Sequence, residues 1–128
     1  MPRTTQLVLT LKSRPGVLAA IARALADAGV NIAALGAGDA AGRGRLRLLV
    51  NNPVKARRAL RAAGFRPTEE PAFVVRLRNK PGALARVAEK VAKARINIRS
   101  AYATTAGRGS AMVVLTVGSP ARARKILR

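Results

Sequence analysis

Hydrophobic residues recur along the chain with two different periods, which alternate in a regular order. Residues 6–11 (QLVLTL) alternate between polar and apolar side chains, a pattern typical of a strand with one buried face. Residues 15–28 instead place Leu, Ile and Ala at helical spacing, so we expect a helix there. The pattern then predicts strands at 30–38 and 45–51 and a second helix at 52–64.

The same order returns in the second half of the chain. Its predicted elements are strand 73–77, helix 81–94, strand 96–104, strand 111–117 and a last helix from Ser119-Pro120. Between the halves, FRPTEEP (65–71) is expected to be a connector with room for a short strand at Phe65–Thr68, which Pro67 would restrict to a sheet edge. The first half is therefore predicted to be βαββαβ. The second is predicted to be βαββα, because the sequence stops before a last strand.

An internal repeat underlies these two halves. RPGVLAAIARALADAGVNI (14–32) returns as KPGALARVAEKVAKARINI (80–98), at a separation of 66 positions. A unit of about 60 residues buries only about 60% of the surface that its unfolded chain exposes and is marginal alone, so we expect the two units to pack on each other. The predicted domains are a first repeat at 1–66, a connector at 67–71 and a truncated second repeat at 72–128.

Short signals mark the ends of the first predicted helix in each repeat. Pro15 suits the first helical turn, with Ser13 or Arg14 near the N-cap. Gly29 ends the helix as a residue that tolerates a positive φ angle. The second repeat has Arg95 at the position of Gly29, and a positive φ there would cost about 1 kcal/mol.

The composition limits the chemistry. The chain has no Cys and no His, which excludes disulfides, thiolate metal sites and the commonest general base. No pair or cluster of acids stands out in the sequence, and Glu69-Glu70 is interpreted as a solvated part of the connector. We therefore expect no enzyme, no metal site and no cofactor. The acidic residues are Asp27, Asp39, Glu69, Glu70 and Glu89.

The net charge of +20, from 25 Lys and Arg against 5 Asp and Glu, is divided equally between the two halves. A field of this size favours polyanions such as nucleic acid. The simpler interpretation is an Arg/Ala-rich composition with solvated basic faces. These faces are Arg45 and Arg47 on a strand, Arg57, Arg58 and Arg61 on one helix, and Arg122, Arg124 and Lys125 on another. The third strand of each repeat lacks the aromatic residues with which RNA-binding sheets stack on bases.

Targeting signals are not apparent in the sequence. No apolar run approaches the roughly 20 residues that a membrane-spanning helix needs. The start, MPRTTQ, lacks the apolar core of a signal peptide. We expect a cytoplasmic protein without a membrane partner.

The paired motifs resemble those of tandem ACT domains. The marks are Ser-Arg-Pro-Gly-Val-Leu and Asn-Lys-Pro-Gly-Ala-Leu before the first helix of each repeat, and Val-Asn-Ile and Ile-Asn-Ile before the second strand. The resemblance covers residues 5–66 and 71–128. It implies an α+β fold of ferredoxin-like βαββαβ repeats, with antiparallel sheets and helices on one face. It also implies a small ligand-binding module of the kind attached to enzymes of amino-acid metabolism.

The resemblance also implies a ligand site where two domains meet. An Asn amide can bond both ends of a zwitterion, and a helix N-terminus offers unpaired N–H groups to a carboxylate. The alternatives are that Pro-Gly only starts a helix and that each Asn only leads into a strand. Gly42-Arg43-Gly44 and Gly107-Arg108-Gly109 are interpreted as hairpin turns rather than a phosphate cradle. The implied ligand-binding residues are Ser13, Pro15, Gly16, Asn31, Asn79, Pro81, Gly82 and Asn97.

Three functions remain open at this level. The first, which we favour, is a non-catalytic regulatory protein that senses a small amino acid, as a homodimer or with an enzyme partner. The second is a basic protein that binds nucleic acid or another polyanion through phosphate contacts. The third is a regulatory subunit that acts by protein pairing without a ligand.

Overall fold

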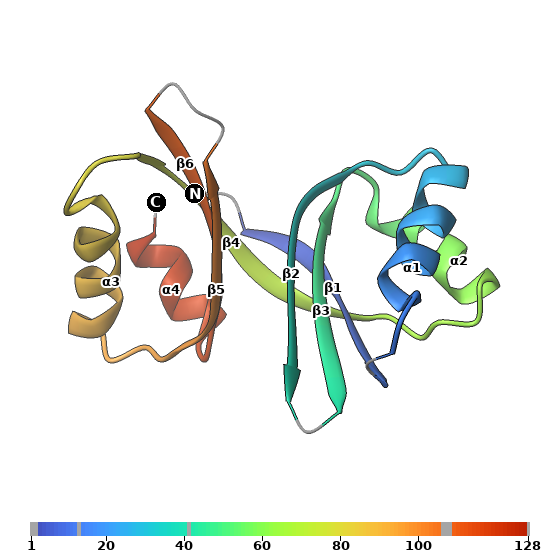
Figure 1. Ribbon diagram of the computed structural model, residues 1–128. Helices are drawn as coiled ribbons and strands as arrows, with labels where there is room; N and C mark the ends of the chain where they lie inside the picture. The colour runs from blue at the N-terminus through green and yellow to red at the C-terminus, as the bar shows by residue number, and fades with distance from the viewer. Residues whose placement is uncertain (1–2, 13, 41, 106–108, 128) are drawn as a thin grey trace. The chain divides into compact units, whose positions relative to one another are not determined.

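The structure is a computed structural model that describes residues 3–12, 14–40, 42–105 and 109–127 (Figure 1). These residues form strands and helices in the α+β order that the periodicity predicts. The elements are β1 (Arg3–Lys12), α1 (Val17–Asp27), β2 (Ile32–Ala40), β3 (Arg43–Val50), α2 (Pro53–Ala62), β4 (Thr68–Arg78), α3 (Ala83–Lys93), β5 (Ile98–Thr105), β6 (Ser110–Val117) and α4 (Pro120–Ile126).

Internal contacts divide the chain into two compact units. The first unit comprises Thr5–Glu70, and the second comprises Pro71–Arg128 together with Met1–Thr4. The division falls inside β4, so the first residues of that strand belong to the first unit and the rest to the second. The domain limits proposed from the sequence, at residues 66 and 72, stay a prediction.

In the first unit, α1 and α2 pack together over one face of an antiparallel sheet in the order β2-β3-β1 (Figure 1). Leu7 pairs with Leu48, and Leu9 with Leu46, so alternate residues of both strands point at the helices. This placement explains why the two strands alternate in sequence. The buried core consists of Leu7, Leu9, Ile21, Leu25, Val30, Leu46, Leu48, Val50, Ala56 and Leu60.

The second unit repeats this design with β5-β6-β4 under α3 and α4 (Figure 1). Its buried core consists of Phe73, Val75, Val91, Ile96, Val113, Leu115, Val117, Ala123 and Leu127. As expected for a repeat without its last strand, no strand follows α4 within residues 109–127. The edge beside β4 is not left open, because the start of β1, Arg3 and Thr4, belongs to this unit and β1 neighbours β4.

The expected connector is a strand instead. β4 runs without a break from Thr68 through Pro71 into the second repeat, so neither a loop at 67–71 nor a separate short strand at 65–68 forms. Partners far along the chain explain this: the Thr68 hydroxyl donates to the Val8 carbonyl at 3.4 Å, and Glu70 binds side chains of β1 and β3. The periodicity could not show these partners.

The helix starts differ from those predicted in one respect. α1 and α3 begin two residues after Pro15 and Pro81, with Gly16 and Gly82 as N-caps in the left-handed conformation. Of the two residues expected near the N-cap, Ser13 lies outside the described residues, and Arg14 lies two residues before the observed N-cap, Gly16. The second helix of each unit does begin as expected, with Pro53 or Pro120 at its first position.

None of the helices in the described residues is long and apolar enough to cross a membrane.

Candidate functional site

A pocket of about 360 Å³ lies in the first unit, beside the first turn of α1. Its walls come from the end of β1, the loop and first turns of α1, the end of β2 and the start of β3. Pro15 and Gly16 lie between two of its lining residues, Arg14 and Val17. The pocket therefore lies at the loop that carries the Pro-Gly motif.

Strand register explains how side chains converge on this pocket. Ala37 of β2 pairs with Leu46 of β3, which faces the helices, and Asp39 lies two residues further along β2. Because side chains alternate across a strand, Asp39 points to the same face as Ala37. Leu11 of β1 borders the same corner of the sheet, where it pairs with Gly44.

The lining combines an apolar floor with charged groups of both signs. The floor is formed by Leu11, Val17, Leu18, Ile21 and Leu46, and Leu18 remains 49% exposed. Lys12 at the end of β1, Arg14 in the loop and Arg45 on β3 supply positive charge. Asp39 supplies the negative charge on β2. The N-cap of α1, Gly16, provides no side-chain cap, and the Val17 N–H donates to the Arg14 carbonyl at 3.4 Å. The next N–H groups of the first turn, those of Leu18 and Ala19, have no acceptor within helix geometry and can bind one from a ligand. Such a pocket suits a small zwitterion with an apolar body.

The two motif glycines have a conformational explanation. Gly16 and Gly82 both have φ of 89°, a conformation that other residues rarely adopt. A Cβ built on either one would meet no atom within 4 Å. Backbone conformation therefore accounts for both glycines, and close approach of a ligand is not needed to explain them.

Asn31 lies at the other end of the first unit from the Pro-Gly loop. The neighbouring Ile32 pairs with Val50 at the end of β3, whereas Lys12 pairs with Arg43 at its start. The Asn31 N–H donates to Oδ1 of Asn51 at 3.0 Å, and the Asn51 N–H donates to the Asn31 carbonyl at 3.2 Å. These bonds extend the pairing of β2 and β3, and they describe a backbone role for Asn31.

In the second unit too, the predicted ligand-binding residues lie at two opposite ends of a strand, β6. The Asn79 N–H donates to the Gly109 carbonyl at 2.7 Å, which places Asn79, Pro81 and Gly82 at the start of β6. Asn97 lies at the end of β6, where its carbonyl accepts from the Gly118 N–H at 2.9 Å. Neither unit by itself brings its Pro-Gly loop and its Asn together, and the eight-residue site stays a prediction.

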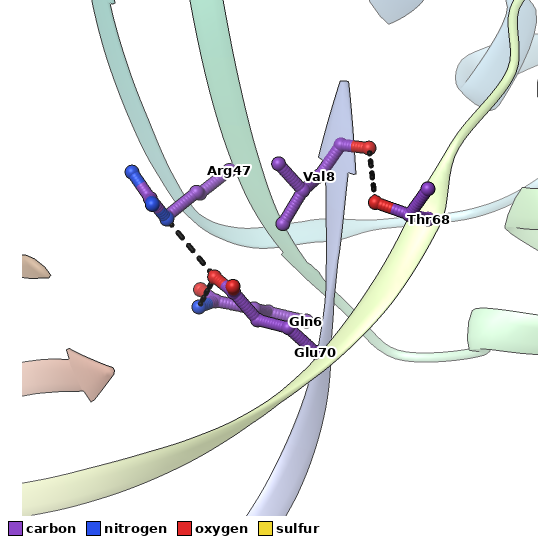
Figure 2. A network of polar contacts seen from close by, with 5 residues as sticks. All are labelled: Gln6, Val8, Arg47, Thr68 and Glu70. Atoms are coloured by element: carbon purple, nitrogen blue, oxygen red, sulfur yellow. Dashed lines mark hydrogen bonds and ion pairs between the residues drawn. The ribbon is translucent and has the colours of Figure 1, made fainter. Parts of the chain in front are cut away.

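Two adjacent acids that the sequence assigned to solvation are engaged in ion pairs. Gln6 is fully buried, and its Nε2 donates to Glu70 Oε1 at 2.7 Å, while Arg47 Nε donates to the same oxygen at 3.0 Å (Figure 2). Glu69 forms an ion pair with Arg57 of α2. The prediction of a solvated strand face is therefore wrong at Arg47, whose side chain is 19% exposed. The predicted helix face remains largely solvated, because Arg58 and Arg61 are exposed and Arg57 is half-buried.

The sequence pointed to the Pro-Gly loop, but it did not predict the residues around that loop that line the pocket. The pattern placed Asp39 in a hairpin turn, but β2 extends to Ala40 and aligns Asp39 with the apolar floor. Lys12 and Arg14 flank Ser13, and their charge was one of many in a basic chain. No group of three or more acids that could hold a metal ion occurs in the part of the chain that the structure describes.

The two βαββα units, each with a left-handed glycine before its first helix, have the ferredoxin-like α+β topology that the sequence predicts. A family model for the ACT domain pair matches residues 3–128, so the chain belongs to this family. A search of curated proteins found no match.

Solved structures agree with this assignment. A protein from Bacteroides thetaiotaomicron superposes with a TM-score of 0.91 at 27% identity, over 98% of this chain and 86% of that one. The regulatory subunit of aspartate kinase from Thermus thermophilus superposes with a TM-score of 0.75 at 20% identity, over 99% of this chain and 91% of that one. The corresponding subunit from Thermus flavus gives 0.68 at 19% identity, over 98% and 88%.

Proposed function

We propose that this ACT domain pair is a non-catalytic regulatory protein that binds a small amino acid with an apolar side chain in the pocket of the first unit. The observation that carries the proposal is that an apolar floor, three cations and one carboxylate line a single pocket of about 360 Å³. Membership of the ACT family and the resemblance to regulatory subunits of aspartate kinase support the regulatory role.

The groups around the pocket match the parts of such a ligand. Its carboxylate would bind Arg14 and the N–H groups at the uncapped start of α1, where the helix dipole favours negative charge. Its ammonium would bind Asp39. An aliphatic side chain would lie against Leu11 and Leu18, which are partly exposed to water, and so would remove apolar surface from solvent.

Regulation would follow from the position of the pocket. The ligand would join α1 to the ends of β1 and β2, which lie on either side of β3 in the sheet. A ligand that binds one arrangement of these elements more tightly shifts the population toward it. We propose that this shift is transmitted to an enzyme partner or to a second copy of the chain.

Thermal melting with each of the twenty amino acids tests the proposal. A ligand at about 100 times its Kd adds about 2.7 kcal/mol, which raises Tm by several degrees in a protein of this size. We expect the largest shifts in Tm from aliphatic amino acids. We expect Asp39→Asn or Arg14→Gln to raise the Kd of such an amino acid at least tenfold and so to reduce the shift. Asp27→Asn is the matched control, because Asp27 lies in an exposed pair with Arg23 outside the pocket.

Two results would contradict the proposal. The first is the absence of a shift with any amino acid. The second is a shift that survives Asp39→Asn but is lost in Asn31→Ala/Asn97→Ala, which would place the ligand at the asparagines instead.

A further inference from the structure

The exposed face of α3 in the second unit carries a row of positive charges. Arg86, Lys90 and Lys93 are all exposed, and they are separated by four and then three residues. At 1.5 Å per residue, successive side chains lie about 6 and 4.5 Å apart along the axis and on one side of the helix. We call these three residues, with Arg95 and Arg122 at the end of the helix, the α3 stripe.

The internal repeat shows that the fold does not require this row. The first unit has Ala20, Ala24 and Asp27 at the positions of Arg86, Lys90 and Lys93. Both helices have eleven residues, and both cover one face of the antiparallel strands of their unit, with a second helix beside them (Figure 1). The α3 stripe is therefore an addition in the second unit and not a feature of the shared architecture.

The end of α3 adds two more cations. Arg95 follows the helix with φ of 56°, at the position where the first unit has Gly29 with φ of 73°. It is the single non-glycine residue with positive φ among those described. Arg122 of α4 donates to the Ala94 carbonyl, which places its guanidinium at the same end of α3. Arg95 is strained where a glycine would not be, and its positive charge is nevertheless present at this position. Backbone strain of this kind is often found at functional sites, so we infer a function for the charge.

Helix stability alone does not explain the α3 stripe. Cations in the last turn stabilise the helix dipole, which accounts for Lys90 and Lys93. Arg86 lies in the fourth position of the helix, where the dipole does not favour positive charge. Glu89 is the one acid in α3, and no ion pair within the described ranges includes Arg86, Lys90 or Lys93.

We propose that the α3 stripe binds the phosphate backbone of nucleic acid without reading its sequence. Cations in a row along a helix can neutralise successive phosphates, and α3 has no aromatic residue that could stack on bases. A membrane surface fits less well, because the exposed Leu84 lies two residues before Arg86 and so faces nearly the opposite side of α3. This surface lies in the second unit and does not depend on the pocket of the first.

The test measures fluorescence anisotropy of the full chain with labelled duplex DNA and single-stranded RNA of about 20 nucleotides, at about 50 to 200 mM salt. The variant Arg86→Ala/Lys90→Ala/Lys93→Asp gives α3 the residues of α1 and removes four charges. Loss of three phosphate contacts should lower the slope of log K against log salt by about 2.7 on duplex DNA and about 2.1 on single strands. We expect at least a tenfold loss of affinity.

The matched control is Arg58→Ala/Arg61→Ala/Arg66→Asp, which removes the same charge from exposed positions of the first unit. We expect it to change the affinity less than threefold. Melting of each variant checks that it folds. Arg95→Gly separates binding from stability, because it should weaken binding severalfold without lowering Tm.

Three results would overturn the proposal. One is the absence of binding at the lowest salt. Another is an equal loss in the control variant, which would show that net charge alone attracts the nucleic acid. The third is tighter binding to poly-glutamate or to phosphatidylserine vesicles than to DNA or RNA, which would assign the α3 stripe to an acidic protein or a membrane.

Discussion

The two repeats end their first helices, α1 and α3, in the same way. The position after the helix has positive φ in both units, as expected, with Gly29 in one and Arg95 in the other. A cation from the following helix lies near each helix end. Lys55 Nζ lies 3.6 Å from the place of a Cβ on Gly29, and Arg122 donates to the Ala94 carbonyl. Positive charge at this end stabilises the helix dipole.

The residue with the clearest cost to stability is Arg95. We expect Arg95→Gly to raise the free energy of unfolding by up to about 1 kcal/mol, because glycine adopts this backbone conformation without strain. The gain is limited by the greater freedom of glycine in the unfolded chain. Urea unfolding measures the change, and Gly29→Arg in the first unit should lower stability. A loss of stability in Arg95→Gly would show that the arginine makes stabilising contacts.

At the scale of elements, β4 is where the sequence was most misleading. Residues 67–71, with two prolines and two glutamates, were predicted to be a connector between the repeats, yet β4 begins at Thr68 and passes through Pro71. The reason is that the first residues of β4 bind distant segments, because β1 lies beside β4 in the sheet and Glu70 binds side chains of β1 and β3. Glu70 Oε1 accepts from both Gln6 and Arg47, and only one of these three side chains belongs to β4 (Figure 2).

Adjacent glutamates allow a matched test of this network. We expect Glu70→Ala to lower the free energy of unfolding by about 2 kcal/mol, because it removes the acceptor of two hydrogen bonds beside the buried Gln6. Glu69→Ala should cost less than about 1 kcal/mol, because its ion pair with Arg57 is more exposed. Chemical unfolding of both variants gives the comparison. Equal effects would mean that the network contributes no more than a surface pair.

At the scale of the whole molecule, the feature with the largest expected effect on stability is the net positive charge. The net charge of +20 makes the folded chain repel itself, and few acids are present to offset it. The ion pairs within the described residues already engage three of the five acids. A chain with this balance depends on counterions from solution.

We therefore expect salt to stabilise the protein. Tm should rise by several degrees as NaCl increases to about 0.15 M, where the screening length is about 8 Å, and then level off. Differential scanning calorimetry measures the rise, and sucrose at equal osmolality is the control for effects unrelated to charge. A Tm that falls with salt would show that attraction between charges outweighs repulsion.

The sequence by itself determined the repeat, the order of strands and helices, and the family. Local periodicity carries this information, because a helix or strand with one buried face must place its apolar residues at 3.6 or 2 residue spacing. The positive φ after each first helix was also predictable, since Gly29 marked it and Arg95 aligned with it. The Pro-Gly motif indicated the loop beside the pocket, although the motif residues themselves do not line it.

Tertiary structure alone decided the rest. It extended β2 so that Asp39 faces the pocket, joined Glu70 to Gln6 and Arg47, and continued β4 through the expected connector. It also separated Asn31 from the Pro-Gly loop by the length of the sheet. Each of these outcomes depends on which distant segments become neighbours, and pairing between segments about 20 to 65 residues apart leaves no period in the local sequence.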